Sequence, residues 1–152
     1  MKKKVILIGL CVFVLLQLIR PQMNKSAQSF EGTKIQDVPN DVQTILKNSC
    51  FDCHSNNTVY PWYAYLQPVA FLLNQHIFEG KAALNFDEFK TYQLKKQYNK
   101  IKSIGRQIKD DKMPLKSYRL LHSKAHLSDK EKLLLINWSD STYNLLKTKS
   151  QN

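Results

Sequence analysis

Two cysteines and a histidine stand close together in residues 48–57, NSCFDCHSNN. Cys50, Cys53 and His54 form the order Cys-x-x-Cys-His, which is typical of covalent haem attachment. Each thiol can add to one vinyl group of the haem as a thioether, and the adjacent imidazole can bind the iron. We therefore predict one covalent haem c, held by Cys50 and Cys53, with His54 as the proximal ligand. The third cysteine, Cys11, lies in an N-terminal apolar run and is given no role.

The same residues permit two other interpretations. A disulfide or a thioredoxin-like redox pair could use Cys50 and Cys53, but that motif is expected after a strand, and the segment before Cys50 has a helical pattern. A structural zinc site could combine the two cysteines with His122 and His126, which have His-x3-His spacing. The long separation from Cys53, and the lack of a role for His54, count against zinc.

A six-coordinate iron needs a second axial ligand, and Met113 is the predicted one. It lies in the segment DDKMPLKSY, where Pro114 stiffens a loop that could present the sulfur across the haem from His54. His76, near the end of an apolar helical segment, is the alternative ligand. His122 and His126 are assigned to surface or helix-end positions.

The elements that must position these residues are predicted to be helices. One helix runs from Asn40 into Cys50, and a second occupies residues 69–79 after Pro68 and ends before Gly80. One or two helices fit residues 85–109, opened by a capping box of Asn85 and Glu88. The last helix starts with Ser128 and Glu131 in the same register and contains Trp138. No segment alternates as a strand does, so we predict an all-α, small cytochrome c-like helical domain in which the first of these helices crosses the last.

The N-terminus has the pattern of an export signal. Lys2, Lys3 and Lys4 precede an apolar run over residues 5–19, and Arg20 follows without a small-residue cleavage site. We predict an uncleaved anchor helix over residues 1–20, although about 22 Å of helix is short for a hydrocarbon core of roughly 30 Å. A polar tether over residues 21–37 and a haem-binding domain over residues 38–149 would follow. The predicted location is the cytoplasmic membrane, with the domain on the periplasmic side.

The chain carries 23 Lys and Arg against 12 Asp and Glu, a formal net charge of +11. Such a surface can simply keep a protein dissolved, or it can steer a redox partner with an acidic docking surface. No nucleic-acid-binding motif is present, and nucleic acid is not expected as a partner.

No pattern suggests a general base, a nucleophile or a phosphate loop, so we predict an electron carrier rather than an enzyme. A haem-based sensor or peroxidase-like protein with a labile sixth ligand is the alternative, followed by a thiol-disulfide oxidoreductase. The donor, the acceptor, the reduction potential and the oligomeric state stay open.

The chain also resembles the small membrane-anchored haem-binding domain proteins found mostly in Bacteroidetes. The resemblance rests on CFDCHSNNTVYPWY, and also on LIRPQMN, PVAFLLNQHIFEGKAALNF, MPLKSYRLLHSKAHLSDKEK and the closing INW, which together cover most of residues 17–138. It implies haem attachment at Cys50, Cys53 and His54 and a cytochrome role. The family often has Met-Pro-Pro where this chain has Met113, Pro114 and Leu115.

Overall fold

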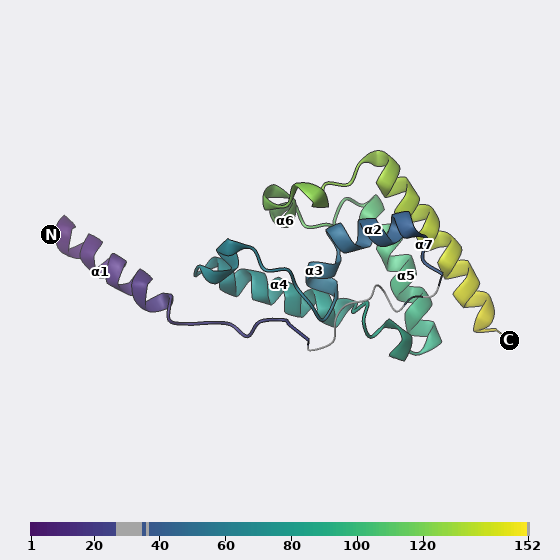
Figure 1. The fold of residues 1–152 in the computed structure, drawn as a ribbon, viewed down its shortest axis with the longest axis horizontal. Helices are drawn as coiled ribbons and strands as arrows, with labels where there is room; N and C mark the ends of the chain where they lie inside the picture. Colours follow the sequence, from purple (N-terminus) through teal and green to yellow (C-terminus); the bar gives the residue numbers. More distant parts are fainter. Residues whose placement is uncertain (27–34, 36, 152) are drawn as a thin grey trace.

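The computed structural model describes residues 1–26, 35 and 37–151, and within them every regular element is a helix (Figure 1). This confirms the predicted all-α class. The α-helices are α1 (Lys2–Leu16), α2 (Asn40–Ser49), α3 (Phe51–His54), α4 (Val69–Ala83), α5 (Leu94–Lys109), α6 (Lys116–Leu121) and α7 (Asp129–Lys149). Three short 3₁₀ helices join them: η1 (Trp62–Tyr65), η2 (Phe89–Thr91) and η3 (Ser123–Ala125).

The N-terminal helix α1 projects away from the other helices, and none of its 15 residues is buried (Figure 1). It ends at Leu16, inside the apolar run, with Gln17 as its C-cap. Gln17 donates to the Phe13 carbonyl at 3.0 Å and accepts from the Gln67 backbone N–H at 3.0 Å. In the described residues no helix has the length and apolar character needed to cross a membrane. The predicted anchor over residues 1–20 is therefore wrong, and so is the location at the cytoplasmic membrane that was derived from it.

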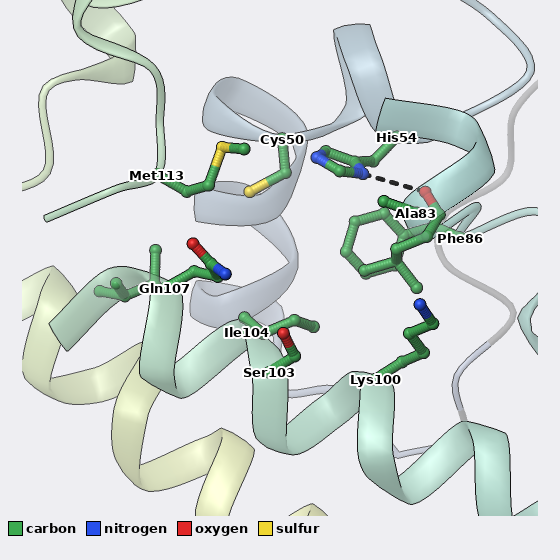
Figure 2. A pocket seen from close by; sticks show the side chains of 11 residues that line it. Cys50, His54, Ala83, Phe86, Lys100, Ser103, Ile104, Gln107 and Met113 are labelled. Carbon is green, nitrogen blue, oxygen red and sulfur yellow. Dashed lines mark hydrogen bonds between the residues drawn. The ribbon is translucent and has the colours of Figure 1, made fainter. Parts of the chain in front are cut away.

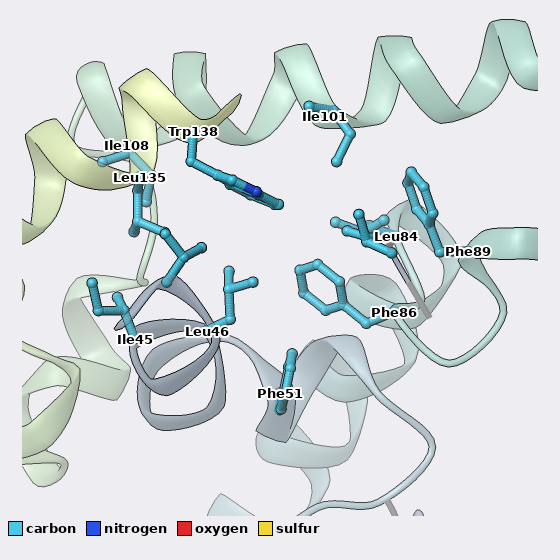
Figure 3. Packing of buried hydrophobic residues seen from close by; sticks show 12 residues of the cluster. Ile45, Leu46, Phe51, Leu84, Phe86, Phe89, Ile101, Ile108, Leu135 and Trp138 are labelled. Atoms are coloured by element: carbon cyan, nitrogen blue, oxygen red, sulfur yellow. The ribbon is translucent and has the colours of Figure 1, made fainter. Parts of the chain in front are cut away.

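The core lies where α5 and α7 pack side by side and α2 covers them (Figures 1 and 3). The predicted contact between the helix that precedes the motif and the last helix is present, but α7 packs more extensively along α5. The seam is close because Gly105 has no side chain: a Cβ there would lie 2.7 Å from Ser139 Oγ. The Ser139 hydroxyl donates to Ile101 O at 2.7 Å and accepts from Gly105 N at 3.2 Å. The buried cluster comprises Ile35, Val42, Ile45, Leu46, Phe51, Leu84, Phe86, Phe89, Ile101, Ile108, Leu135 and Trp138.

Two of the predicted helix boundaries differ from the structure. Helix α4 continues through Gly80 to Ala83, because the glycine lets it pack against the motif. Asn85 and Glu88 do not open a helix. Asn85 is buried, and its amide donates to Asn56 Oδ1 and Glu88 Oε1, both at 2.8 Å.

The predicted start of the last helix is present. A capping box of Ser128 and Glu131 begins α7, as expected. The predicted tether, residues 21–37, lies largely outside the described residues. In its described part, Asn24 bonds to Ser55 O and Thr58 Oγ1 through its side-chain amide.

Candidate haem-binding site

The motif forms one helical turn, α3, directly after α2. The backbone N–H groups of Cys53 and His54 both donate to Cys50 O, at 3.2 and 3.0 Å. Phe51, within this turn, points into the core and meets Phe86 edge-on with ring centroids 5.2 Å apart. Packing of Phe51 thus fixes α3 against the core and leaves the cysteines and His54 to line the space beside it.

The His54 ring is oriented by the end of α4. His54 Nδ1 lies 2.9 Å from Leu84 O, a geometry in which Nδ1–H donates and Nε2 keeps its lone pair. Burial lowers the pKa of His54, and the Leu84 and Gly80 carbonyls offset this only in part. The neutral ring is the form that binds a metal, and a hydrogen bond at the other nitrogen holds such a ligand in place. His54 is therefore prepared to present Nε2.

Gly80 permits this arrangement. A Cβ at that position would lie 2.5 Å from Cys53 O and 3.1 Å from Cys53 Cβ, so any side chain would push α4 away from α3. The glycine therefore brings the C-terminal carbonyls of α4 within reach of His54.

Two cavities of about 170 and 310 Å³ lie against α3, and both are lined by Cys50, His54, Ala83 and Met113. The larger one is also lined by Cys53 and His76, so the structure brings all five predicted site residues together. Figure 2 shows the smaller cavity. In it, the Met113 side chain and the His54 ring lie on either side of Cys50, and side chains of α5 form the opposite wall.

Both thiols of the motif are free, and both cysteines are half-buried. Burial, followed by the proximity of Cys53, raises the pKa of Cys50 to about 12. Burial, followed by the charge of Asp52, raises the pKa of Cys53 to about 12. A redox-active cysteine pair needs the opposite, a lowered thiol pKa. A neutral thioether suits this environment better than a thiolate.

Met113 lies in the loop between α5 and α6. Its backbone N–H donates to Gln107 O at 3.3 Å, which folds the loop back over the end of α5. Asp111, which turns the chain with a φ of 52°, accepts from both Arg119 guanidinium nitrogens at 3.2 Å and from Lys132 Nζ at 3.2 Å. These two cations lower the pKa of Asp111. Through Asp111 the loop is thus bonded to α6 and α7.

Sequence reasoning missed a set of polar residues around the cavities. Lys100, Ser103 and Gln107 follow one face of α5 and line the smaller cavity. Their helical spacing, shared with the apolar Ile104 and Ile108, was the signal that could have identified them. Ser49 lines the larger cavity and is buried, and its hydroxyl has no partner within the described part of the chain.

The two histidines of the zinc interpretation, His122 and His126, line neither of these cavities. His122 stacks on Tyr118 with ring centroids 3.9 Å apart and lies 3.2 Å from the Tyr63 hydroxyl through Nε2. His126 Nε2 lies 2.8 Å from Arg119 O. Across residues 1–26, 35 and 37–151, no three His, Cys, Asp or Glu side chains form a group that could hold a metal ion. The zinc interpretation therefore has no cluster to rest on.

The donors and walls of the cavities fit a haem. Two imidazoles, two thiols and a thioether line the larger cavity. The smaller cavity has the apolar side chains Ala83, Leu84, Phe86, Ile104 and Ile108 in its walls. The unpartnered Ser49 hydroxyl is a hydrogen-bond donor available to a polar group placed there.

Comparison with known proteins identified a family. No curated protein and no solved structure matched the chain. The model of the haem-binding domain family matches residues 11–141, well over half of the sequence. On that match, the chain belongs to the haem-binding domain family and is a haem-binding protein.

Proposed function

We propose that the protein is a mono-haem c-type cytochrome that carries electrons. Cys50 and Cys53 would form the thioethers, His54 would be the proximal ligand and Met113 the distal one. The observation that supports this most directly is the shared cavity lining: Cys50, His54 and Met113 line both cavities, while the Leu84 carbonyl holds His54 Nδ1.

The bound haem would supply an iron that changes between the ferric and ferrous states. The protein's own residues set how easily this happens. The hydrogen bond from His54 Nδ1 to Leu84 O fixes the ring and makes Nε2 a better donor. A thioether from Met113 raises the reduction potential relative to a second imidazole. The apolar walls keep water from the site.

Met113 is proposed over His76 because of the cavities each residue reaches. Met113 lines both, whereas His76, on α4, lines only the larger one. Met113 also lies in a loop whose backbone is bonded to Gln107, so its position is defined.

A partner with an acidic docking surface is part of the proposal. Helix α5 forms one wall of the smaller cavity and contains no Asp or Glu. Its basic residues are Lys95, Lys96, Lys100, Lys102, Arg106 and Lys109. Lys100 lines the cavity itself, so positive charge lies beside the proposed haem site and can attract an acidic partner there.

The test is an absorption spectrum of the full chain, produced with a cytochrome c maturation system, together with a pyridine haemochrome assay. We expect a c-type haemochrome and the weak far-red band of methionine-ligated ferric haem. Met113→Ala should abolish that band and lower the reduction potential, whereas His76→Ala should change neither. A protein without covalent haem would refute the cytochrome, and an unchanged Met113→Ala spectrum would refute the ligand.

A second candidate is a haem-based sensor or peroxidase-like protein with a labile sixth ligand. It is favoured by the polar side of the larger cavity, where His76 and Glu79 lie on the same helix. Rapid binding of carbon monoxide to the ferrous wild type, at the rate seen for Met113→Ala, would support it over the electron carrier.

A further inference from the structure

The helix that follows the Met113 loop has no core packing to hold it. None of the six residues of α6 is buried, and Leu120 and Leu121 are 82% and 64% exposed. An element without buried apolar surface gains little stability from packing and opens easily. The position of α6 must therefore depend on particular polar contacts, whereas in the loop before it Pro114 is buried and Met113 packs against the core.

One of these contacts joins α6 to the haem-attachment motif. The Tyr118 hydroxyl donates to Asp52 Oδ2 at 2.7 Å, and Asp52 lies between Cys50 and Cys53. The other carboxylate oxygen, Oδ1, accepts from Val59 N at 3.0 Å, so the orientation of the carboxylate does not depend on Tyr118 alone. A hydrogen bond to a charged group is stronger than one between neutral groups.

Tyr118 is only five residues from Met113, and both line the larger cavity. Pro114 and Leu115, which lie between them, line it too. Asp111 bonds the loop to Arg119 on α6 and to Lys132 on α7, and these bonds do not involve α3. Among the side-chain hydrogen bonds of the described residues, the bond from Tyr118 to Asp52 is the one that joins α6 to the segment of the cysteines.

We propose that Tyr118 is the positioning residue for the distal ligand: its hydrogen bond to Asp52 holds the Met113 loop closed over the haem site. This inference rests on the proposed ligation by Met113. Without the Tyr118 hydroxyl, the loop should open more often, and an added ligand should displace Met113 from the iron more readily.

The experiment compares Tyr118→Phe with the wild type in the full-length haem protein, using imidazole as the added ligand. Displacing Met113 requires the loop to open, and opening breaks the Tyr118 bond only in the wild type. We expect the affinity of the ferric protein for imidazole to rise about tenfold, the change that corresponds to one hydrogen bond to a charged group. Amide hydrogen exchange in residues 113–121 should also become faster.

The matched control is Tyr60→Phe. The Tyr60 hydroxyl accepts from Asn24 N at 2.6 Å and is not bonded to the Met113 loop. This variant should retain the wild-type imidazole affinity and hydrogen exchange. Wild-type affinity and exchange in Tyr118→Phe would overturn the inference while leaving the cytochrome intact. A wild-type spectrum without methionine ligation, unchanged in Met113→Ala, would overturn both the ligand assignment and the inference.

Discussion

At the scale of single residues, the site depends on how closely α4 approaches the motif. Gly80 has no Cβ, and the carbonyls near it face His54. The hydrogen bond that orients His54 therefore depends on a residue that makes no contact through a side chain. The orientation of the His54 imidazole and the backbone packing at Gly80 therefore depend on each other.

Replacing Gly80 by alanine should destabilise the fold by about 1–3 kcal/mol, because a methyl group would have to fit 2.5 Å from Cys53 O. The gain in helix propensity from Gly to Ala, about 1 kcal/mol, is too small to offset the clash. Urea unfolding of the full chain measures the loss. Since α4 would have to shift, the reduction potential of the haem protein should change as well.

Gly9→Ala is the matched control, because nothing lies within 4 Å of the Cβ it would add. It should leave the unfolding midpoint of the domain unchanged. If Gly80→Ala were as stable as Gly9→Ala, the close packing of α4 on Cys53 would not be a constraint in solution.

At the scale of elements, the start of α7 is fixed by a local bond pattern. Ser128 Oγ accepts from Glu131 N at 3.3 Å, and Glu131 Oε2 accepts from Ser128 N at 2.8 Å. The Ser128 hydroxyl and then the Ser128 backbone N–H, through their hydrogen bonds, lower the pKa of Glu131 below its ordinary 4.5. The folded state thus favours the ionised carboxylate more than the unfolded chain does.

The contribution of Glu131 should therefore depend on pH. It should be fully present above its unfolded pKa and lost as the pH falls through the lower folded value. Ser128→Ala should cost about 1 kcal/mol at neutral pH. The free energy of unfolding of Glu131→Gln should fall below that of the wild type at neutral pH, and the difference should vanish on acidification. Urea unfolding at both pH values measures it.

Ser141→Ala, on an exposed position of α7, controls for the loss of a serine hydroxyl within the same helix. It should match the wild type at both pH values. A Glu131→Gln deficit that persists in acid would show that the carboxylate acts by packing and not by its charge.

Capping boxes also show which part of the fold the sequence could predict. The box at Ser128 was predicted because both partners are local and exposed. The same spacing at Asn85 and Glu88 failed, because Asn85 is buried and its amide bonds to Asn56, 29 residues earlier. The motif residues were predictable for the same reason as Ser128: their chemistry lies within five consecutive positions. The bond from Tyr118 to Asp52 joins residues 66 positions apart, so no local sequence pattern predicts it.

At the scale of the whole molecule, the predicted anchor failed because hydropathy alone was used to set its length. The apolar run extends to Ile19, but the helix ends at Leu16, and the next side chain, Gln17, bonds to Gln67. The sequence gives the polarity of Gln17 but not its distant partner. The basic residues of α5 contribute to the formal excess of +11, and one of them, Lys100, lines the smaller cavity.

This placement of charge predicts how the reduced haem protein exchanges electrons with small reagents. Two oxidants test this: anionic hexacyanoferrate(III) and cationic tris(phenanthroline)cobalt(III). The ratio of their rate constants should favour the anionic oxidant by more than the difference in driving force accounts for. Lys100→Glu should lower the ratio of the two rate constants by roughly tenfold at low ionic strength, because it reverses the charge at the cavity. Stopped-flow kinetics measures both rates.

Lys149→Glu makes the same change in net charge at the end of α7, and Lys149 lines neither cavity. If the local field beside the site governs the approach of the oxidant, Lys149→Glu should alter the ratio far less than Lys100→Glu. Both effects should shrink near physiological ionic strength, where the screening length is about 8 Å. Equal effects of the two substitutions would mean that net charge alone steers the reagents and that α5 is not the docking face.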